Sequence, residues 1–318
     1  LGHEAGVPAG VFNVVPGARE DAATIGGVLT SDPRVRKLSF TGSTAVGKIL
    51  LAQCASTIKK VSLELGGNAP LIVFDDADVD AAVNGVMVAK FRNAGQVCVA
   101  ANRILVQSGI YTKFADAMAA RVAGLRVGAG IEEGTDVGPL IDEGGLKKVE
   151  AHIEDARGGG ATVRVGAARH ERGGTFFQPT LLEGVTMDMQ MANEETFGPV
   201  AGLTKFDGEE EAIRIANDTP MGLASYFFSR DIGRVTRVSE ALEYGMVGVN
   251  TGAMSTTVAP FGGIKERGLG REGSKHGLDE RTELHFRCLF FTSDAPAHLT
   301  SPHPSRARVS PHTTHSHH

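Results

Sequence analysis

The chain contains a few residues whose types and spacing could carry out chemistry, and the first is a cysteine. Cys98 stands in the mostly uncharged stretch FRNAGQVCVAAN (91–102). A thiolate is a strong nucleophile, but a lone cysteine is more often a small buried hydrophobe, and the local sequence fits both. The other cysteines, Cys54 and Cys288, form no CxxC pair with it and adjoin no histidine cluster. We therefore expect neither a disulfide framework nor a metal site.

A carboxylate that could act as a general base lies in LELGG (63–67). Glu64 falls at the end of a predicted strand whose other residues are mostly apolar. Proteins of the α/β class place active sites at the carboxyl edge of a parallel sheet, and partial burial there raises a carboxyl pKa toward neutrality. Glu64 is thus a candidate base, and a surface glutamate at a strand end is the alternative.

A candidate phosphate site lies in FTGSTAVGK (40–48), where a predicted strand enters a glycine turn and a helix begins at Ser43 or Thr44. Free backbone N–H groups and the positive end of the helix dipole meet at such a turn. Gly42 permits close approach of the backbone to a ligand, and Gly47 permits close packing of the helix. The segment matches neither GxGxxG nor GxxxxGK followed by Ser or Thr, so a capped helix after a tight turn is the alternative.

Two loops add candidate ligand contacts. In EETFGPV (194–200), Glu195 could bind a ribose and Phe197 could lie against a flat ring, and an ordinary loop with a buried phenylalanine is the alternative. The glycine-rich segment PFGGIKERGLGREG (260–273) either closes over a ligand or connects the sheet to the C-terminus.

The elements that must position these residues alternate between strands and helices. Hydrophobic patterning predicts strands or extended segments at 11–15, 35–40, 61–65, 69–75, 104–107, 160–166, 176–185, 199–206, 224–229 and 246–250. It predicts helices at 45–59, 78–92, 111–124, 146–157, 209–216 and 232–242. Helical connections of this length imply crossovers, so the sequence predicts an α/β fold with mostly parallel sheets.

Composition narrows the function classes. With 318 residues, of which 42% are hydrophobic, the chain is long enough for about two domains. The net charge of -5 gives no reason to expect a nucleic-acid or membrane partner, and no apolar run reaches the ~18 residues of a membrane helix. The start lacks Met and the features of a signal peptide, so the chain is expected to begin inside a longer protein.

Five ordered motifs together resemble the aldehyde dehydrogenase superfamily, from about Gly6 to about Leu284. They are LSFTGSTAVGK, VSLELGGNAP, FRNAGQVCVAANR, EETFGPV and APFGGIK. Four longer segments resemble more narrowly the succinate-semialdehyde dehydrogenases. These are AGVPAGVFNVVPG (5–17), KKVSLELGGNAPLIVFDDAD (59–78), NTGAMSTTVAPFGG (250–263) and GLGREGSKHGLDE (268–280).

The resemblance implies a mechanism with Cys98 as the nucleophile. Its thiolate adds to the aldehyde to give a thiohemiacetal, and hydride passes to the nicotinamide of NAD or NADP. Water then hydrolyses the thioester with Glu64 as general base. The remaining residues that the resemblance assigns to the cofactor are Gly42, Ser43 and Gly47 near the pyrophosphate, Leu65 in the same site, Glu195 on the nicotinamide ribose and Phe197 beside the ring.

The resemblance also implies that the substrate is a small-molecule aldehyde with an acid group. This substrate would be succinate semialdehyde, which is oxidised to succinate. Arg92, six positions before Cys98, and Ser255 would bind the distal carboxylate. A solvated helix residue is the alternative for Arg92. Another acid-bearing substrate, such as glutarate semialdehyde, and a non-catalytic truncated remnant are the alternative functions.

The family organisation implies a partial Rossmann-type domain followed by a complete catalytic domain. The implied segments are 1–66 of the NAD(P)-binding domain, 67–265 as catalytic domain, 266–292 as C-terminal return and oligomerisation segment, and 293–318 as a disordered tail. The tail holds four prolines and six histidines. Loose metal binding by His312, His315, His317 and His318 is the alternative to a solvated tail. The family implies a homodimer or homotetramer, and either a cytoplasmic or a mitochondrial location.

Three departures from the family pattern affect the expected activity. The family's longer N-terminus carries an asparagine of the oxyanion hole, a contribution of roughly 3–4 kcal/mol, so we expect this chain alone to be poorly stable and inactive. Ala100 stands where some relatives have a second cysteine, so no local disulfide switch is expected. Arg267 stands where the family usually has a small serine.

Overall fold

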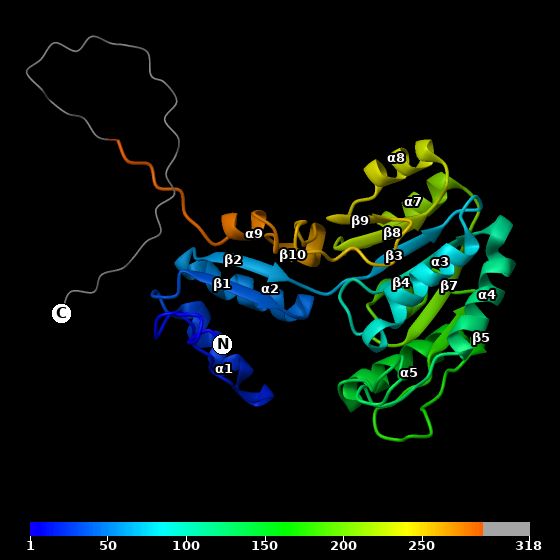
Figure 1. Cartoon of the computed structure of the whole chain (residues 1–318), viewed down its shortest axis with the longest axis horizontal. Helices are drawn as coiled ribbons and strands as arrows, with labels where there is room; N and C mark the ends of the chain where they lie inside the picture. The colour runs from blue at the N-terminus through cyan, green and yellow to red at the C-terminus, as the bar shows by residue number, and fades with distance from the viewer. Residues whose placement is uncertain (289–318) are drawn as a thin grey trace, which may run out of the picture. The chain divides into compact units, whose positions relative to one another are not determined.

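The computed structural model describes residues 1–288, and the chain divides into two compact units, Leu1–Thr282 and Glu283–His318. The predicted tail at 293–318 lies outside the described residues. In the second unit, the described residues 283–288 form no helix or strand. The folded elements described below all belong to the first unit (Figure 1).

A seven-stranded sheet forms the larger part of this unit, with the strand order β5-β6-β7-β4-β3-β8-β9. All its neighbouring pairs are parallel except β5 with β6. The strands are β3 (Ala69–Val73), β4 (Ala101–Gln107), β5 (Thr162–Val165), β6 (Thr180–Glu183), β7 (Val200–Phe206), β8 (Ala224–Phe228) and β9 (Met246–Val249). The α/β class with mainly parallel pairing is therefore confirmed.

A second, three-stranded sheet has the order β1-β2-β10, with β1 (Lys37–Thr41), β2 (Lys60–Glu64) and β10 (Gly268–Leu269). β1 and β2 are parallel, and β10 returns from far along the chain to pair antiparallel with β2, Gly268 opposite Glu64. In Figure 1 the orange segment that carries β10 accordingly lies beside the blue strands. The predicted division at residue 66 falls between β2 and β3 and stays a prediction.

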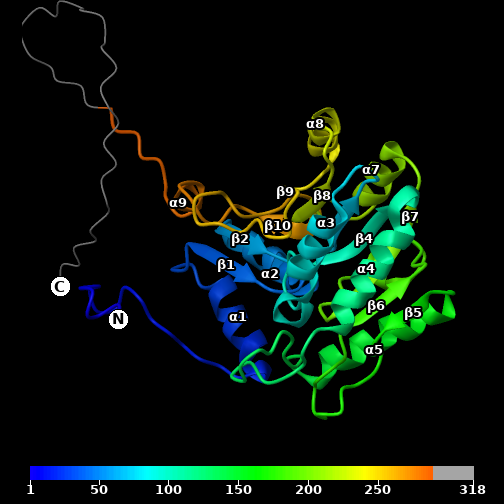
Figure 2. The same cartoon turned by 45° about the vertical axis from the view of Figure 1, so that its right-hand side comes forward.

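Helices cover both faces of the large sheet because successive strand side chains point to opposite sides. Leu71 and Val73 of β3 pack in one cluster with α3 and α4, whereas Ile72 packs in another with α7 and α8 (Figure 1, Figure 2). The helices are α1 (Ala22–Ser31), α2 (Thr44–Cys54), α3 (Val79–Val86), α4 (Tyr111–Ala123), α5 (Glu143–Gly158), α6 (Gln190–Asn193), α7 (Glu209–Asn217), α8 (Ile232–Ala241) and α9 (His276–Asp279). A third cluster joins α5 to β6.

The prediction of a strand at 11–15 was wrong. Its residues pair with no other described strand, and the side chains of Val11, Phe12, Val14 and Val15 are 70%, 77%, 74% and 77% exposed. A β-branched run becomes a strand only where a neighbouring strand satisfies its backbone groups. The helix α1 was missed, because its two glycines weaken the helical pattern.

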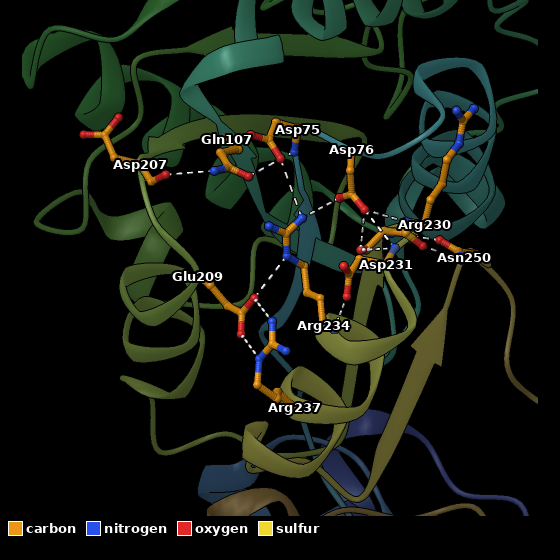
Figure 3. Close-up of polar contacts among 11 residues, drawn as sticks. Asp75, Asp76, Gln107, Asp207, Glu209, Arg230, Asp231, Arg234, Arg237 and Asn250 are labelled. Atoms are coloured by element: carbon orange, nitrogen blue, oxygen red, sulfur yellow. Dashed lines mark hydrogen bonds and ion pairs between the residues drawn. The ribbon is translucent and has the colours of Figure 1, made fainter.

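The carboxyl edge of the large sheet is closed by an ion-pair network (Figure 3). Asp76, just beyond β3, accepts hydrogen bonds from the Ser229 hydroxyl and from two backbone N–H groups at the start of α8. Arg234 of α8 donates to Asp76 at 2.5 Å and to Glu209 of α7 at 3.1 Å. The network therefore anchors both helices of one sheet face to the strand ends.

We predict that Asp76→Asn lowers the free energy of unfolding by about 1–3 kcal/mol, because an amide cannot replace these charge-assisted bonds. Burial raises the pKa of Asp76, but the bonds from Ser229, Arg230 and Asp231 and the charge of Arg234 outweigh it, and the net pKa falls below 3.8. The carboxylate's stabilisation is thus present above about pH 4 and is lost as pH falls through the folded pKa. Urea titrations at pH 7 and pH 3 test both points.

Asp80→Asn is the matched control, because Asp80 is an exposed aspartate of α3. It should change the unfolding free energy by less than about 1 kcal/mol. Equal losses in the two variants would contradict an anchoring role for Asp76.

Candidate active site

Seven of the ten predicted site residues line one pocket of about 360 Å³. The pocket lies at the carboxyl ends of β1 and β2 and also takes in segments that precede β3, β4 and β7 of the large sheet. A hollow of about 410 Å³ beside α2 contains none of the ten. The residues that line the site pocket are Thr41, Gly42, Ser43, Glu64, Leu65, Gly66, Cys98, Glu195 and Phe197.

Glu64 is a buried carboxylate, 6% exposed, at the last position of β2. Its Oε2 accepts a hydrogen bond from Nη2 of Arg267 at 3.1 Å. Burial raises the pKa of Glu64 to about 7, although the charge of Arg267 acts in the opposite direction. The alternative of a surface glutamate is therefore excluded, and this carboxyl titrates in the range that general-base catalysis needs.

Cys98 is half-buried in the loop between a distorted helix and β4. α3 continues into a π-helix, Met87–Phe91, and then into a 3₁₀ turn, Arg92–Gly95. Asn93, Ala94 and Gly95 all have positive φ, a strained run of the kind that accumulates at functional sites. Burial raises the pKa of the Cys98 thiol, and the charge of Arg267 works against that rise.

Gly67 joins the two sheets at the pocket. A Cβ at this position would lie 2.1 Å from the carbonyl oxygen of Cys98, so only glycine fits. The N–H of Gly67 donates to Oε1 of Glu195 at 3.1 Å. Burial raises the pKa of Glu195, and this hydrogen bond is the strongest effect that lowers it.

A buried amide network supports the loop that carries Glu195. Asn102 of β4 donates to Asn68 Oδ1 at 2.7 Å and to the carbonyl of Glu194 at 2.9 Å. Lys90 donates to Asn102 Oδ1 at 3.4 Å, and burial lowers the pKa of Lys90 to about 8. The side chain of Phe197 is 40% exposed with φ +54°, so the alternative of a buried phenylalanine was wrong.

The turn before α2 supplies the third wall of the pocket. Ser43 caps the helix by accepting a hydrogen bond from the N–H of Val46 at 3.4 Å, so the capped-helix interpretation holds for this turn. Gly47 lies outside the lining and instead lets α2 pack against Leu65, whose Cδ2 would be 2.4 Å from a Cβ there. The hydroxyl of Thr44 is buried without a hydrogen-bond partner. A buried hydroxyl without a hydrogen-bond partner at a helix N-terminus is suited to donate to an anionic ligand.

The two predicted substrate residues do not line the pocket. Arg92 is exposed at the start of the 3₁₀ turn. Burial raises the pKa of Tyr226, and the charges of Arg92 and Cys98 both act on this residue, with opposite signs. The hydroxyl of Tyr226 donates to the carbonyl of Val99 at 2.9 Å. Ser255 is exposed in the loop after β9.

Sequence reasoning missed four residues that contribute to the site. Arg267 was noticed as a departure, but nothing local predicted that it would pair with Glu64. Gly66 and Gly67 carried a signal in the doubled glycine of LELGG, which marks close backbone approach. No feature of the sequence marked Asn102 as part of the site, because a polar residue in a strand is usually exposed.

The described residues show neither a membrane span nor a metal cluster. Within 1–288, no helix is long and apolar enough to cross a bilayer. In that same range, no three His, Cys, Asp or Glu side chains gather to hold a metal ion. The pocket combines a thiol, a near-neutral carboxyl and a helix N-terminus, a set suited to covalent chemistry on a carbonyl group.

Comparison with known proteins gives the same family throughout. The model of the aldehyde dehydrogenase family matches residues 1–286. The chain is 60% identical to 3-sulfolactaldehyde dehydrogenase of Pseudomonas putida and 58% identical to succinate-semialdehyde dehydrogenase [NADP(+)] GabD of Escherichia coli, each time over 91% of this chain and 59% of the relative. The chain thus spans less than two thirds of these relatives' length.

Solved structures agree. A succinate-semialdehyde dehydrogenase from Burkholderia pseudomallei superposes with a TM-score of 0.85 at 59% identity, over 87% of this chain and 57% of that one. Betaine aldehyde dehydrogenase from Staphylococcus aureus, in complex with NAD+, gives 0.83 at 39% identity, over 87% and 56%. A family match across most of the residues, together with this agreement in fold, shows that the chain belongs to the aldehyde dehydrogenase family.

Proposed function

We propose that the pocket carries out NAD(P)+-dependent oxidation of an aldehyde with a distal anionic group, with succinate semialdehyde as substrate and succinate as product. The observation that carries this proposal is the convergence of Cys98, Glu64, Glu195 and Phe197 on one pocket from three separate segments. A thiol and a carboxyl with a pKa near 7 in one cavity are the two groups that acyl-enzyme chemistry needs.

The residues present fit a dinucleotide cofactor. The N-terminus of α2 with its unpartnered Thr44 hydroxyl suits a pyrophosphate, and Gly42 lines the pocket in the turn before this helix. Glu195 would hold a ribose hydroxyl, and the exposed face of Phe197 would contact the nicotinamide ring. When bound, the cofactor supplies the hydride acceptor. The choice between NAD and NADP depends on the adenosine ribose, which none of the assigned residues contacts.

The chain's own residues then perform the covalent steps. Cys98 loses its proton to solvent water, and its thiolate attacks the aldehyde carbon. With the hydride passed to a bound cofactor, the acyl group would remain on Sγ as a thioester. Oε2 of Glu64 is held by Arg267, so Oε1 is the oxygen that takes a proton from the attacking water. Attack of that water breaks the C–S bond and returns the acid product and the free cysteine.

The substrate proposal rests on what the relatives share. Close relatives include enzymes for 3-sulfolactaldehyde, succinate semialdehyde and glutarate semialdehyde, at 60%, 58% and 56% identity. Each of these molecules carries an aldehyde and an acid group, so a cation near the nucleophile is the common requirement. Arg92 fits that requirement, and Ser255 would assist it. Glutarate semialdehyde remains the second candidate, because the identities differ by so little.

A single-turnover experiment tests the central assignment. The chain is mixed with succinate semialdehyde and NAD+ or NADP+, and the cysteine peptides are then analysed by mass spectrometry. Long incubation is used because this chain alone is expected to turn over too slowly for a steady-state assay. We predict a succinyl thioester on Cys98 that accumulates in Glu64→Gln, because removal of the base slows hydrolysis by about 100–10,000-fold.

Cys98→Ser is the matched control and should give no acylated peptide and no reduced cofactor. Acylation of Cys54 or Cys288 instead would contradict the assignment. Complete lack of acylation in the folded chain would favour the non-catalytic alternative.

The pH dependence of thioester hydrolysis gives a second test. Because burial raises the pKa of Glu64 to about 7, its basic form disappears as pH falls through that value. Hydrolysis of a preformed acyl-Cys98 should therefore be maximal above pH 7 and should fall about tenfold for each pH unit below it. A stopped-flow pH profile measures this, and Glu64→Gln should remove the inflection. An inflection that persists in this variant would assign the titration to another group.

Substrate choice is tested at Arg92. Arg92→Gln should lower kcat/KM for succinate semialdehyde by about 10–100-fold, the value of a lost charge-assisted hydrogen bond. Kinetics with an uncharged aldehyde of equal length provide the control, since that substrate has no group for the guanidinium to bind. An equal loss with both aldehydes would mean that Arg92 supports the loop rather than the substrate.

A further inference from the structure

Arg267 is a fully buried cation beside the pocket, with 1% of its surface exposed. Its Nη2 donates to Oε2 of Glu64, and its Nε and Nη1 are buried without any hydrogen-bond partner. A guanidinium has five N–H donors in a fixed fork, and leaving buried donors unused is costly. The remaining donors are therefore available to a further acceptor, and the Cys98 thiol is a group that interacts with this guanidinium.

The fold holds this arginine firmly in place. Its carbonyl accepts a hydrogen bond from the N–H of Leu65 at 3.0 Å, so the ladder between β10 and β2 begins at Arg267 itself. Gly263 makes room for the side chain, because a Cβ there would lie 2.4 Å from Cγ of Arg267. Lys265 has φ +58° and is tied to Glu243 at 2.6 Å, which fixes the turn. The fold thus fixes the guanidinium behind the pocket lining, against Glu64.

Several charges face this guanidinium. Glu64, Cys98 and Glu195 each interact with it electrostatically, and the guanidinium favours the ionised form of all three. Arg271 and Glu272 also act on Glu64, with opposite signs, and Lys90 and Lys148 act on Glu195. Among the described residues, Arg267 is the cation whose charge lowers the pKa of Cys98, whereas Glu195 and Glu64 raise it. Burial disfavours the thiolate most strongly, and the guanidinium opposes that effect in part.

We propose that Arg267 is a positioning residue that holds Glu64 through Nη2 and stabilises the Cys98 thiolate through its remaining N–H groups. The inference rests on the proposed function, in which Cys98 is the nucleophile. A substrate-binding role is excluded because the side chain is buried and does not line the pocket. Arg267 therefore acts through the two catalytic side chains.

The test is the pH dependence of Cys98 alkylation by iodoacetamide, followed peptide by peptide with mass spectrometry. Only the thiolate reacts, so the midpoint of the profile reports the Cys98 pKa. In Arg267→Met, which keeps a similar side-chain volume, the midpoint should rise by about one pH unit or more. Cys98 should then react about tenfold more slowly near neutral pH.

The other two cysteines are internal controls in the same samples. Cys288 is exposed and should keep its profile in every variant, whereas Cys54 is 2% exposed and should stay unreactive while the chain is folded. If Cys54 becomes reactive in Arg267→Met, that variant has unfolded, and Glu64→Gln is then compared with the double variant Glu64→Gln/Arg267→Met. Both of these variants have a neutral amide at position 64, so loss of Arg267 leaves no unpaired buried carboxylate there.

The double variant should show the higher Cys98 midpoint of that pair. Equal midpoints in folded proteins, with and without Arg267, would overturn the inference. Alkylation needs neither aldehyde nor cofactor, so its outcome is separate from that of the proposed function. A chain that never acylates Cys98 could still show the Arg267 effect, and an active enzyme could lack it.

Discussion

The close approach of Gly67 to the carbonyl of Cys98 is the constraint on which the site depends. A Cβ at Gly67 would lie 2.1 Å from that oxygen, and the same residue donates its N–H to Glu195. Glu64 is three residues earlier in the chain, at the end of β2. One glycine therefore sets the distance between the segment with the carboxyl and the loop with the thiol. A side chain at this position would push the segment with Glu64 away from the loop with Cys98.

The carboxyl and amino edges of the large sheet have different roles, one in anchoring helices and the other in forming the pocket. Its carboxyl edge, where α/β proteins usually bind ligands, is closed by Asp76, Arg234 and their partners (Figure 3). The pocket instead lies at the carboxyl edge of the small sheet and at segments that precede strands of the large one. The general rule for active sites thus applies to the small sheet, while the same edge of the large sheet anchors α7 and α8.

The pKa values of the acidic groups in the pocket are set by burial and by the few positive charges that oppose it. Burial raises the pKa of Glu64, of Glu195 and of the Cys98 thiol, because each loses water that would solvate its charge. Arg267 opposes all three shifts from a single position. The buried guanidinium therefore limits the rise in the pKa of the thiol, while the pKa of Glu64 stays near 7.

The sequence by itself determined the class of fold, the order of most elements and the family. Periodicity located the parallel strands because β3, β4 and β8 are buried on both faces, which makes them nearly continuous apolar runs. It placed a strand at 11–15, where no described strand pairs, because a local pattern cannot supply a neighbour. Ordered motifs named Cys98, Glu64, Glu195 and Phe197 as candidates.

Only the tertiary structure decided which candidates share a pocket. Cys98 and Glu64 come together through β2, Gly67 and the loop before β4, and no local rule relates those segments. Arg267 lies 203 positions from Glu64 and reaches it because β10 returns to pair with β2. Hydrogen bonding between distant strands, and burial within the assembled fold, set that ion pair. Neither can be derived from the spacing of residues along the chain.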